Sequence, residues 1–189
     1  MSILTRTLTS LLALTTIAGT IAPRVEAAPV TGNHEDHVIL WNTIREAGVR
    51  TYINPKQCFE EDFKNTDGFY ISNGKGILVV CQDNMKRPGI EVAWTANDYD
   101  TLRHEVVHLI QDCRDGRGDN SLIPILEFDE LKGFVSRVLT PEQVERIIKS
   151  YRKRGVSDEQ IINELEAFAI ARVVNASEIA ESVEQYCMS

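Results

Sequence analysis

The stretch HEVVHLIQDC, residues 104–113, contains two histidines four positions apart, with a glutamate directly after the first. On a helix, side chains at positions i and i+4 lie one turn apart on the same face, so His104 and His108 can direct both imidazoles at one ion. Glu105 reaches the same side of such a site without having to coordinate. The stretch is therefore predicted to be a metal-binding helix that carries a general base.

The residues around this stretch predict its local structure. Apolar residues recur at helical spacing through residues 97–113, and Asn97 or Asp98 suits the N-cap of an amphipathic helix. Before it, GFYIS (68–72) and ILVVCQD (77–83) are β-rich runs joined by NGKG, which is typical of a hairpin. IEVAW, residues 90–94, is a candidate for a further strand.

The C-terminal half is predicted to be helical. Thr140 and Ser157 each begin a capping-box pattern, and the second of the two helices can run on toward Val183. An amphipathic helix is also predicted at residues 34–47, ended by Gly48. We expect a single α+β domain over residues 28–189, with a small sheet beside the HEVVH helix.

Residues 1–27 have the parts of a secretory signal peptide: a positive charge at Arg6, an apolar run over residues 8–21 and a small-residue cleavage site before Ala28. A membrane anchor is the alternative, but the apolar run is short and is broken by Gly19. The mature protein is therefore predicted to be secreted or periplasmic, without a stable membrane span. Cleavage changes the formal net charge from −8 to −9, which argues against a nucleic-acid-binding surface.

The four cysteines all lie in the mature chain, and an even number in an exported protein predicts two disulfides. Three pairings are open. We favour Cys58 with Cys81, which flank the predicted hairpin, and Cys113 with Cys187, which would tie the C-terminal tail to the end of the HEVVH helix. A cysteine zinc site has little support because no two cysteines are spaced as CxxC.

Two histidines leave a catalytic zinc ion one protein ligand short. No histidine follows His108, so a carboxylate from a downstream helix is the economical choice. The segment NELEAFAIARV offers Glu164 and Glu166, and both stay open as the third ligand. Glu164 shares a helix face with Ala167 and Ala171, whose small side chains would let the metal-binding helix approach closely.

HEVVH followed by ELEAFA resembles the gluzincin zinc metallopeptidases, over about residues 66–174. A glutamate three positions before an alanine is similar to the pattern of the CAAX-prenyl endopeptidase-like group and of repressor-cleaving metallopeptidases. The resemblance implies a zincin-like fold, Zn²⁺ as cofactor, His104, His108 and Glu164 as metal ligands, and Glu105 as general base. Phe168 departs from it, since an aspartate or asparagine is common at that position.

The predicted function is zinc-dependent hydrolysis of peptide bonds in a protein or peptide substrate. One alternative is a secreted, non-catalytic zincin-like protein that binds or inhibits a partner; another is a lipid- or wall-associated helical module. Tyr151 and Tyr186 are the candidates for an oxyanion donor. His34 and His37 also have ligand spacing, but a solvated helix start is the preferred interpretation. The sequence does not determine the oligomeric state.

Overall fold

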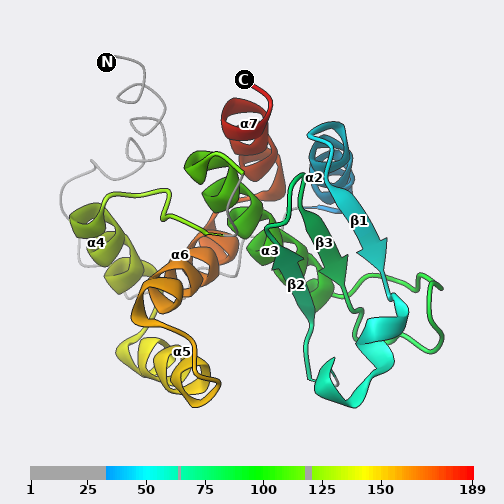
Figure 1. Cartoon of the computed structure of the whole chain (residues 1–189), viewed down its shortest axis with the longest axis horizontal. Coiled ribbons are helices and arrows are strands. Elements are labelled where there is room, and N and C mark those ends of the chain that lie inside the picture. Colours follow the sequence, from blue (N-terminus) through cyan, green and yellow to red (C-terminus); the bar gives the residue numbers. More distant parts are fainter. Residues whose placement is uncertain (1–32, 64, 118–120) are drawn as a thin grey trace, which may run out of the picture.

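The computed structural model describes residues 33–63, 65–117 and 121–189, and the predicted signal peptide, residues 1–27, lies outside them. The described chain is a mixed α+β structure, as expected. A small sheet lies on one side of helix α3 (Ala96–Asp115), and helices cover the other side (Figure 1).

The sheet has three strands, in the order β1 (Arg50–Ile53), β3 (Ile77–Val80) and β2 (Gly68–Ile71). β3 runs antiparallel to β2, so the predicted hairpin is confirmed, and parallel to β1. Two short 3₁₀ helices, η2 (Lys56–Phe59) and η3 (Glu61–Phe63), connect β1 to β2. β2 is an edge strand that packs directly on α3.

Helix α3 forms the centre of the molecule. Residues from Thr101 to Asp112 are all buried. Strands β2 and β3 pack on one side of the helix, and helices α6 and α7 pack against its other sides. Thr95 is the N-cap and Asp98 completes a capping box with it, so the predicted start at Asn97 or Asp98 was two or three residues late. Gly116 ends the helix in the left-handed conformation, with φ of 98°.

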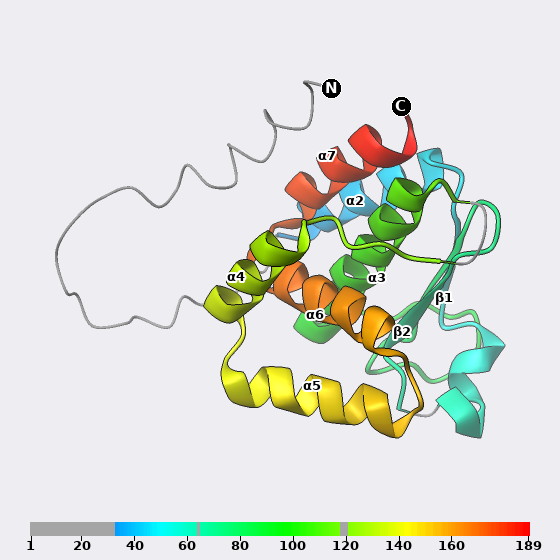
Figure 2. The same ribbon diagram turned by 60° about the vertical axis from the view of Figure 1, so that its left-hand side comes forward.

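The remaining helices surround α3. α2 (His34–Glu46) packs against α7 (Ala176–Cys187), and α7 packs against α3. α6 (Asp158–Val173) crosses α3, while α4 (Phe128–Val138) and α5 (Pro141–Lys153) pack against α6 (Figure 2). The capping boxes predicted at Thr140 and Ser157 are both present.

The expectation that the helix beginning after Ser157 runs toward Val183 was wrong. The helix ends at Val173, and Val174 is extended. The side chain of Asn175 accepts a hydrogen bond of 2.9 Å from the backbone N–H of Glu178, which starts a separate helix. An N-cap inside an apolar pattern therefore divides the segment into α6 and α7.

IEVAW, residues 90–94, was expected as a strand but forms none. Side chains take the place of a neighbouring strand: Gln82 hydrogen-bonds both the N–H and the carbonyl of Val92, and Asn54 donates to the carbonyl of Ile90. Gln82 and Asn54 are fully buried and bonded to each other. The segment's polar backbone groups are thus satisfied by buried amides rather than by a sheet.

The structure contains disulfides Cys58–Cys81 and Cys113–Cys187, which confirms the favoured pairing. The first joins η2 to the residue after β3, and the second joins α3 to α7. Both are consistent with a secreted protein. Within the described residues, no helix has the length and apolar character needed to cross a membrane.

Candidate metal centre

Three side chains from two helices meet in one place. His104 and His108 of α3 direct their Nε2 atoms at each other across 3.1 Å. The Oε2 atom of Glu164, from α6, lies 3.2 Å from the first nitrogen and 3.5 Å from the second. Both histidines are buried, and the Glu164 side chain is 18% exposed. This group could hold a metal ion.

The charges of these side chains depend on one another. Burial lowers the pKa of His108, but its hydrogen bond to Glu164 and the charge of that carboxylate prevail and raise it to about 9. Burial alone would raise the pKa of Glu164, yet the two histidines hold it well below its usual range. The carboxylate is therefore ionised, as a metal ligand must be.

The tautomer of His108 is set by Gln111, one turn further along α3. The amide nitrogen of Gln111 donates to the carboxylate of Glu166 over 2.8 Å and to the carbonyl of Asn163 over 3.1 Å. Both partners are acceptors, so the amide oxygen must face His108, and it accepts from Nδ1 over 2.8 Å. A proton on Nδ1 leaves the lone pair of a neutral His108 on Nε2, the atom that faces the group.

Glu166, the other candidate for the third ligand, has a different position. It is fully buried and accepts hydrogen bonds from Gln111 and from the backbone N–H groups of Ile125 and Leu126, each between 2.7 and 2.8 Å. Burial raises the pKa of Glu166, and these hydrogen bonds oppose the rise. Of the two glutamates, the structure brings only Glu164 to the histidines. Glu166 is linked to His108 indirectly, through the side chain of Gln111.

His104 is held differently from His108. Its Nδ1 atom is buried and has no hydrogen-bond partner among the described residues. The ring instead packs against Phe168, with ring centroids 4.4 Å apart, and meets His108 edge-on. Phe168, the residue that departs from the gluzincin pattern, thus positions the first histidine by ring packing.

Glu105 lies beside the metal group, at the point where α3 meets the sheet. Its side chain is buried and accepts a hydrogen bond from the backbone N–H of Tyr70, in β2. A Cβ on Gly68 would lie 2.6 Å from Thr101 and 3.2 Å from Glu105, so the strand can approach α3 this closely only with glycine there. Burial raises the pKa of Glu105, against the opposing charges of His104 and His108.

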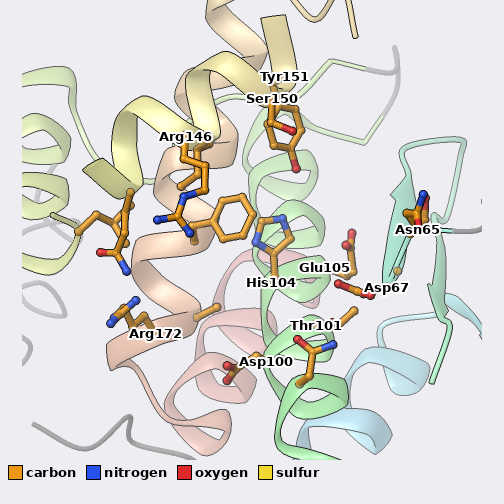
Figure 3. Close-up of a pocket in the computed structure, with 18 of the residues that line it drawn as sticks. Asn65, Asp67, Asp100, Thr101, His104, Glu105, Arg146, Ser150, Tyr151 and Arg172 are labelled. Carbon is orange, nitrogen blue, oxygen red and sulfur yellow. The ribbon is translucent and has the colours of Figure 1, made fainter. Parts of the chain in front are cut away.

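His104 and Glu105 line a cavity of about 530 Å³ between the sheet side of α3 and helices α5 and α6. Figure 3 shows Tyr151 projecting from α5 toward the two residues. Burial, and then the charge and hydrogen bond of Glu164, raise the pKa of Tyr151, so its hydroxyl keeps its proton. Tyr186, the other predicted oxyanion donor, packs against the main hydrophobic core instead.

The two N-terminal histidines lie outside this group, and the interpretation of both as solvated was wrong for one of them. His34 is exposed, with Nδ1 2.6 Å from the hydroxyl of Tyr99. His37 is buried: its Nδ1 bonds the carbonyl of Asn33, and its Nε2 lies 2.6 Å from the guanidinium of Arg103. Burial, with a smaller effect of Arg103, lowers the pKa of His37.

The supporting residues Gln111 and Glu166 were not recognised as a pair in the sequence. Gln111 follows His108 at i+3 and so shares its helix face, which is a signal that the sequence does contain. Its link to Glu166 spans 55 positions and two helices. Only the packing of α6 on α3 brings these two residues together.

Comparison with known proteins gives a family but no activity. The model of the domain of unknown function DUF8637 matches residues 30–188, which is most of the chain. No curated protein and no solved structure matches this chain. The matched range includes both helices of the metal group and both disulfides. The chain therefore belongs to the DUF8637 family.

Proposed function

We propose that this protein is a secreted or periplasmic zinc metallopeptidase with a zincin-like arrangement of sheet and helices. The observation that carries the proposal is the triangle formed by the donor atoms of His104, His108 and Glu164, whose edges measure 3.1, 3.2 and 3.5 Å. A zinc ion bound to nitrogen and oxygen at about 2.0–2.1 Å in tetrahedral geometry would separate its ligands by about 3.3 Å. The triangle thus has the size that zinc requires.

The chemistry of the donors also suits zinc. Two imidazoles and one carboxylate are the ligand set of catalytic zinc sites that keep one position open for water. The hydrogen bond from His108 to Gln111 leaves a ligand lone pair in place. The cavity beside His104 and Glu105 gives a substrate access to the group.

A zinc ion held here would supply a Lewis acid that polarises the scissile carbonyl and makes a bound water more acidic. Glu105 follows the ligand His104 directly and lines the same cavity, which places it to accept a proton from the attacking water. The water oxygen bonds to the carbonyl carbon, the C–N bond breaks, and Glu105 returns the proton to the amine nitrogen. Tyr151 is the candidate donor to the developing oxyanion.

The sheet supports a peptide as substrate. β2 is an edge strand beside the cavity, and Gly68 of this strand lines the cavity wall. An extended peptide can add to such an edge through backbone hydrogen bonds, which bind any sequence. The two disulfides support the proposed export, since they persist in an oxidising compartment.

Metal content and hydrolysis together test the proposal. Mature protein purified without an affinity tag is expected to contain about one zinc per chain, measured by mass spectrometry, and to cleave an unfolded protein. His104→Ala and Glu164→Ala should lose the metal, whereas His34→Ala, the matched control outside the group, should keep it. Glu105→Gln should keep the metal and lose hydrolysis.

Each other outcome has a definite meaning. No zinc in the wild type after supplementation would end the metallopeptidase proposal. Zinc bound without hydrolysis of any protein or peptide would favour the alternative, a non-catalytic binding or inhibitory protein.

A further inference from the structure

The wall of the cavity formed by α5 and α6 is basic, although the whole chain carries a formal net charge of −8. It has three arginines: Arg146, Arg154 and Arg172. Figure 3 shows Arg146 and Arg172 on the helical side of the opening, with Asp67 across from them beside the sheet. A substrate that enters the cavity passes between these two walls.

Among the described residues, none of these three arginines forms an ion pair with a carboxylate. Arg146 and Arg172 are exposed and form no ion pair with any other residue in the described part of the chain. Arg154 differs, because its guanidinium lies over the ring of Tyr151 at 4.2 Å. Two guanidinium groups beside the metal group therefore remain available to a bound molecule.

The acidic groups of the same cavity are already engaged. Asp100 pairs with Arg103. Glu105 accepts from the backbone of Tyr70, and Asp67 accepts a side-chain hydrogen bond from Asn97. Neutral donors leave the charges of Glu105 and Asp67 in place on the sheet side, so the positive charge that a substrate meets lies on the helical wall. Arginine binds carboxylates with two parallel hydrogen bonds, which makes it suited to this recognition.

We propose that Arg146 and Arg172 bind carboxylates of the substrate, so that the site selects acidic peptides. The proposal rests on the proposed function, because it places a peptide in the cavity beside the metal group. The carboxylates come from Asp or Glu side chains near the scissile bond, or from a free C-terminus. The formal net charge of −8 opposes non-specific attraction of such peptides to the protein as a whole.

Peptide binding to the metal-loaded Glu105→Gln protein tests this inference without requiring turnover. The probes are fluorescent peptides of one sequence in which the flanking residues are Asp and Glu, Asn and Gln, or Lys, each with a free or an amidated C-terminus. The acidic peptides are expected to bind about five- to tenfold more tightly than the amide-containing ones at low salt, and the difference should shrink at high salt. Weaker binding on amidation of the C-terminus, with no effect of the flanking residues, would assign the carboxylate to the C-terminus.

Two double variants made in the same protein give a matched comparison. Arg146→Glu with Arg172→Glu should abolish the preference or reverse it toward the Lys peptide. Arg45→Glu with Arg137→Glu changes the net charge equally at exposed positions outside the cavity and should leave the preference intact. Equal binding of all peptides, or equal effects of the two double variants, would overturn the inference.

Failure of the inference is distinguishable from failure of the proposed function. If the wild type binds zinc and cleaves peptides without charge preference, only the substrate class is wrong. If acidic peptides bind selectively at Arg146 and Arg172 but none is cleaved, the arginine site stands and the peptidase proposal falls.

Discussion

His108 donates from Nδ1 to the amide oxygen of Gln111 over 2.8 Å, and this single contact determines which ring nitrogen faces the metal group. Without an acceptor at Gln111, the ring of His108 can exchange tautomers and rotate. We predict that Gln111→Met lowers zinc affinity by about 10- to 100-fold, the usual effect of losing such a supporting contact. A chelator-competition titration measures this.

The control for Gln111→Met is Gln57→Met, on the exposed side of η2. Nitrogen NMR of the metal-free protein, recorded above the His108 pKa of about 9 so that the ring is neutral, adds an independent readout. The wild type should show the proton of His108 on Nδ1, and the variant should show a mixture of tautomers. Unchanged affinity and an unchanged tautomer in Gln111→Met would show that Gln111 has no positioning role.

Glu166 is predicted to be required for stability rather than as a ligand. Glu166→Gln places an NH₂ group among three donors, those of Gln111, Ile125 and Leu126, and so leaves buried donors unsatisfied. We expect a loss of about 2 kcal/mol in the free energy of unfolding, measured by chemical denaturation. Glu159→Gln, exposed on the same helix, should cost less than about 0.5 kcal/mol. Equal stability of the two variants would contradict this role.

His37 predicts a pH dependence of stability. Its Nε2 faces the Arg103 guanidinium, so the folded protein favours neutral His37, and burial lowers its pKa below 6.5. The hydrogen bond to the carbonyl of Asn33, and then the charges of Asp36 and Asp100, oppose this shift but do not reverse it. The unfolded state therefore binds the proton more readily. This contribution to stability is full above pH 6.5 and is lost as the pH falls from 6.5 through the folded-state pKa.

Denaturation of the wild type and of His37→Gln at pH 7.5 and pH 5 checks the prediction. Because other groups also titrate, the measured quantity is the difference between the two proteins. The wild type should lose more stability than His37→Gln over this interval. An identical loss would show that His37 does not contribute.

The two disulfides are predicted to contribute unequally to stability. Cys113–Cys187 closes a separation of 74 residues and Cys58–Cys81 one of 23. A chain-entropy treatment assigns about 4 kcal/mol to the first and about 3 kcal/mol to the second. Paired Cys→Ser variants, compared by thermal unfolding, should follow that order. The opposite order would mean that local packing around η2 outweighs loop closure.

Local features were predicted well where the residues that cause them are close in sequence. The capping boxes at Thr140 and Ser157, the turn between β2 and β3, and the helical spacing of His104 and His108 all depend on neighbours within a few positions. IEVAW was mispredicted because its β-rich composition is overridden by Gln82 and Asn54, which reach it through buried side-chain hydrogen bonds.

The sequence by itself determined the two-histidine helix, the adjacent Glu105, the α+β class and a preference between the disulfide pairings, since periodicity, turn residues and spacing encode these directly. Only the tertiary structure decided between Glu164 and Glu166, linked Gln111 to His108 and Glu166, and placed Arg146 and Arg172 in the cavity. The physical reason is the crossing of α6 over α3. Two glutamates two positions apart lie on different sides of a helix, and the packing partner decides which one faces the histidines.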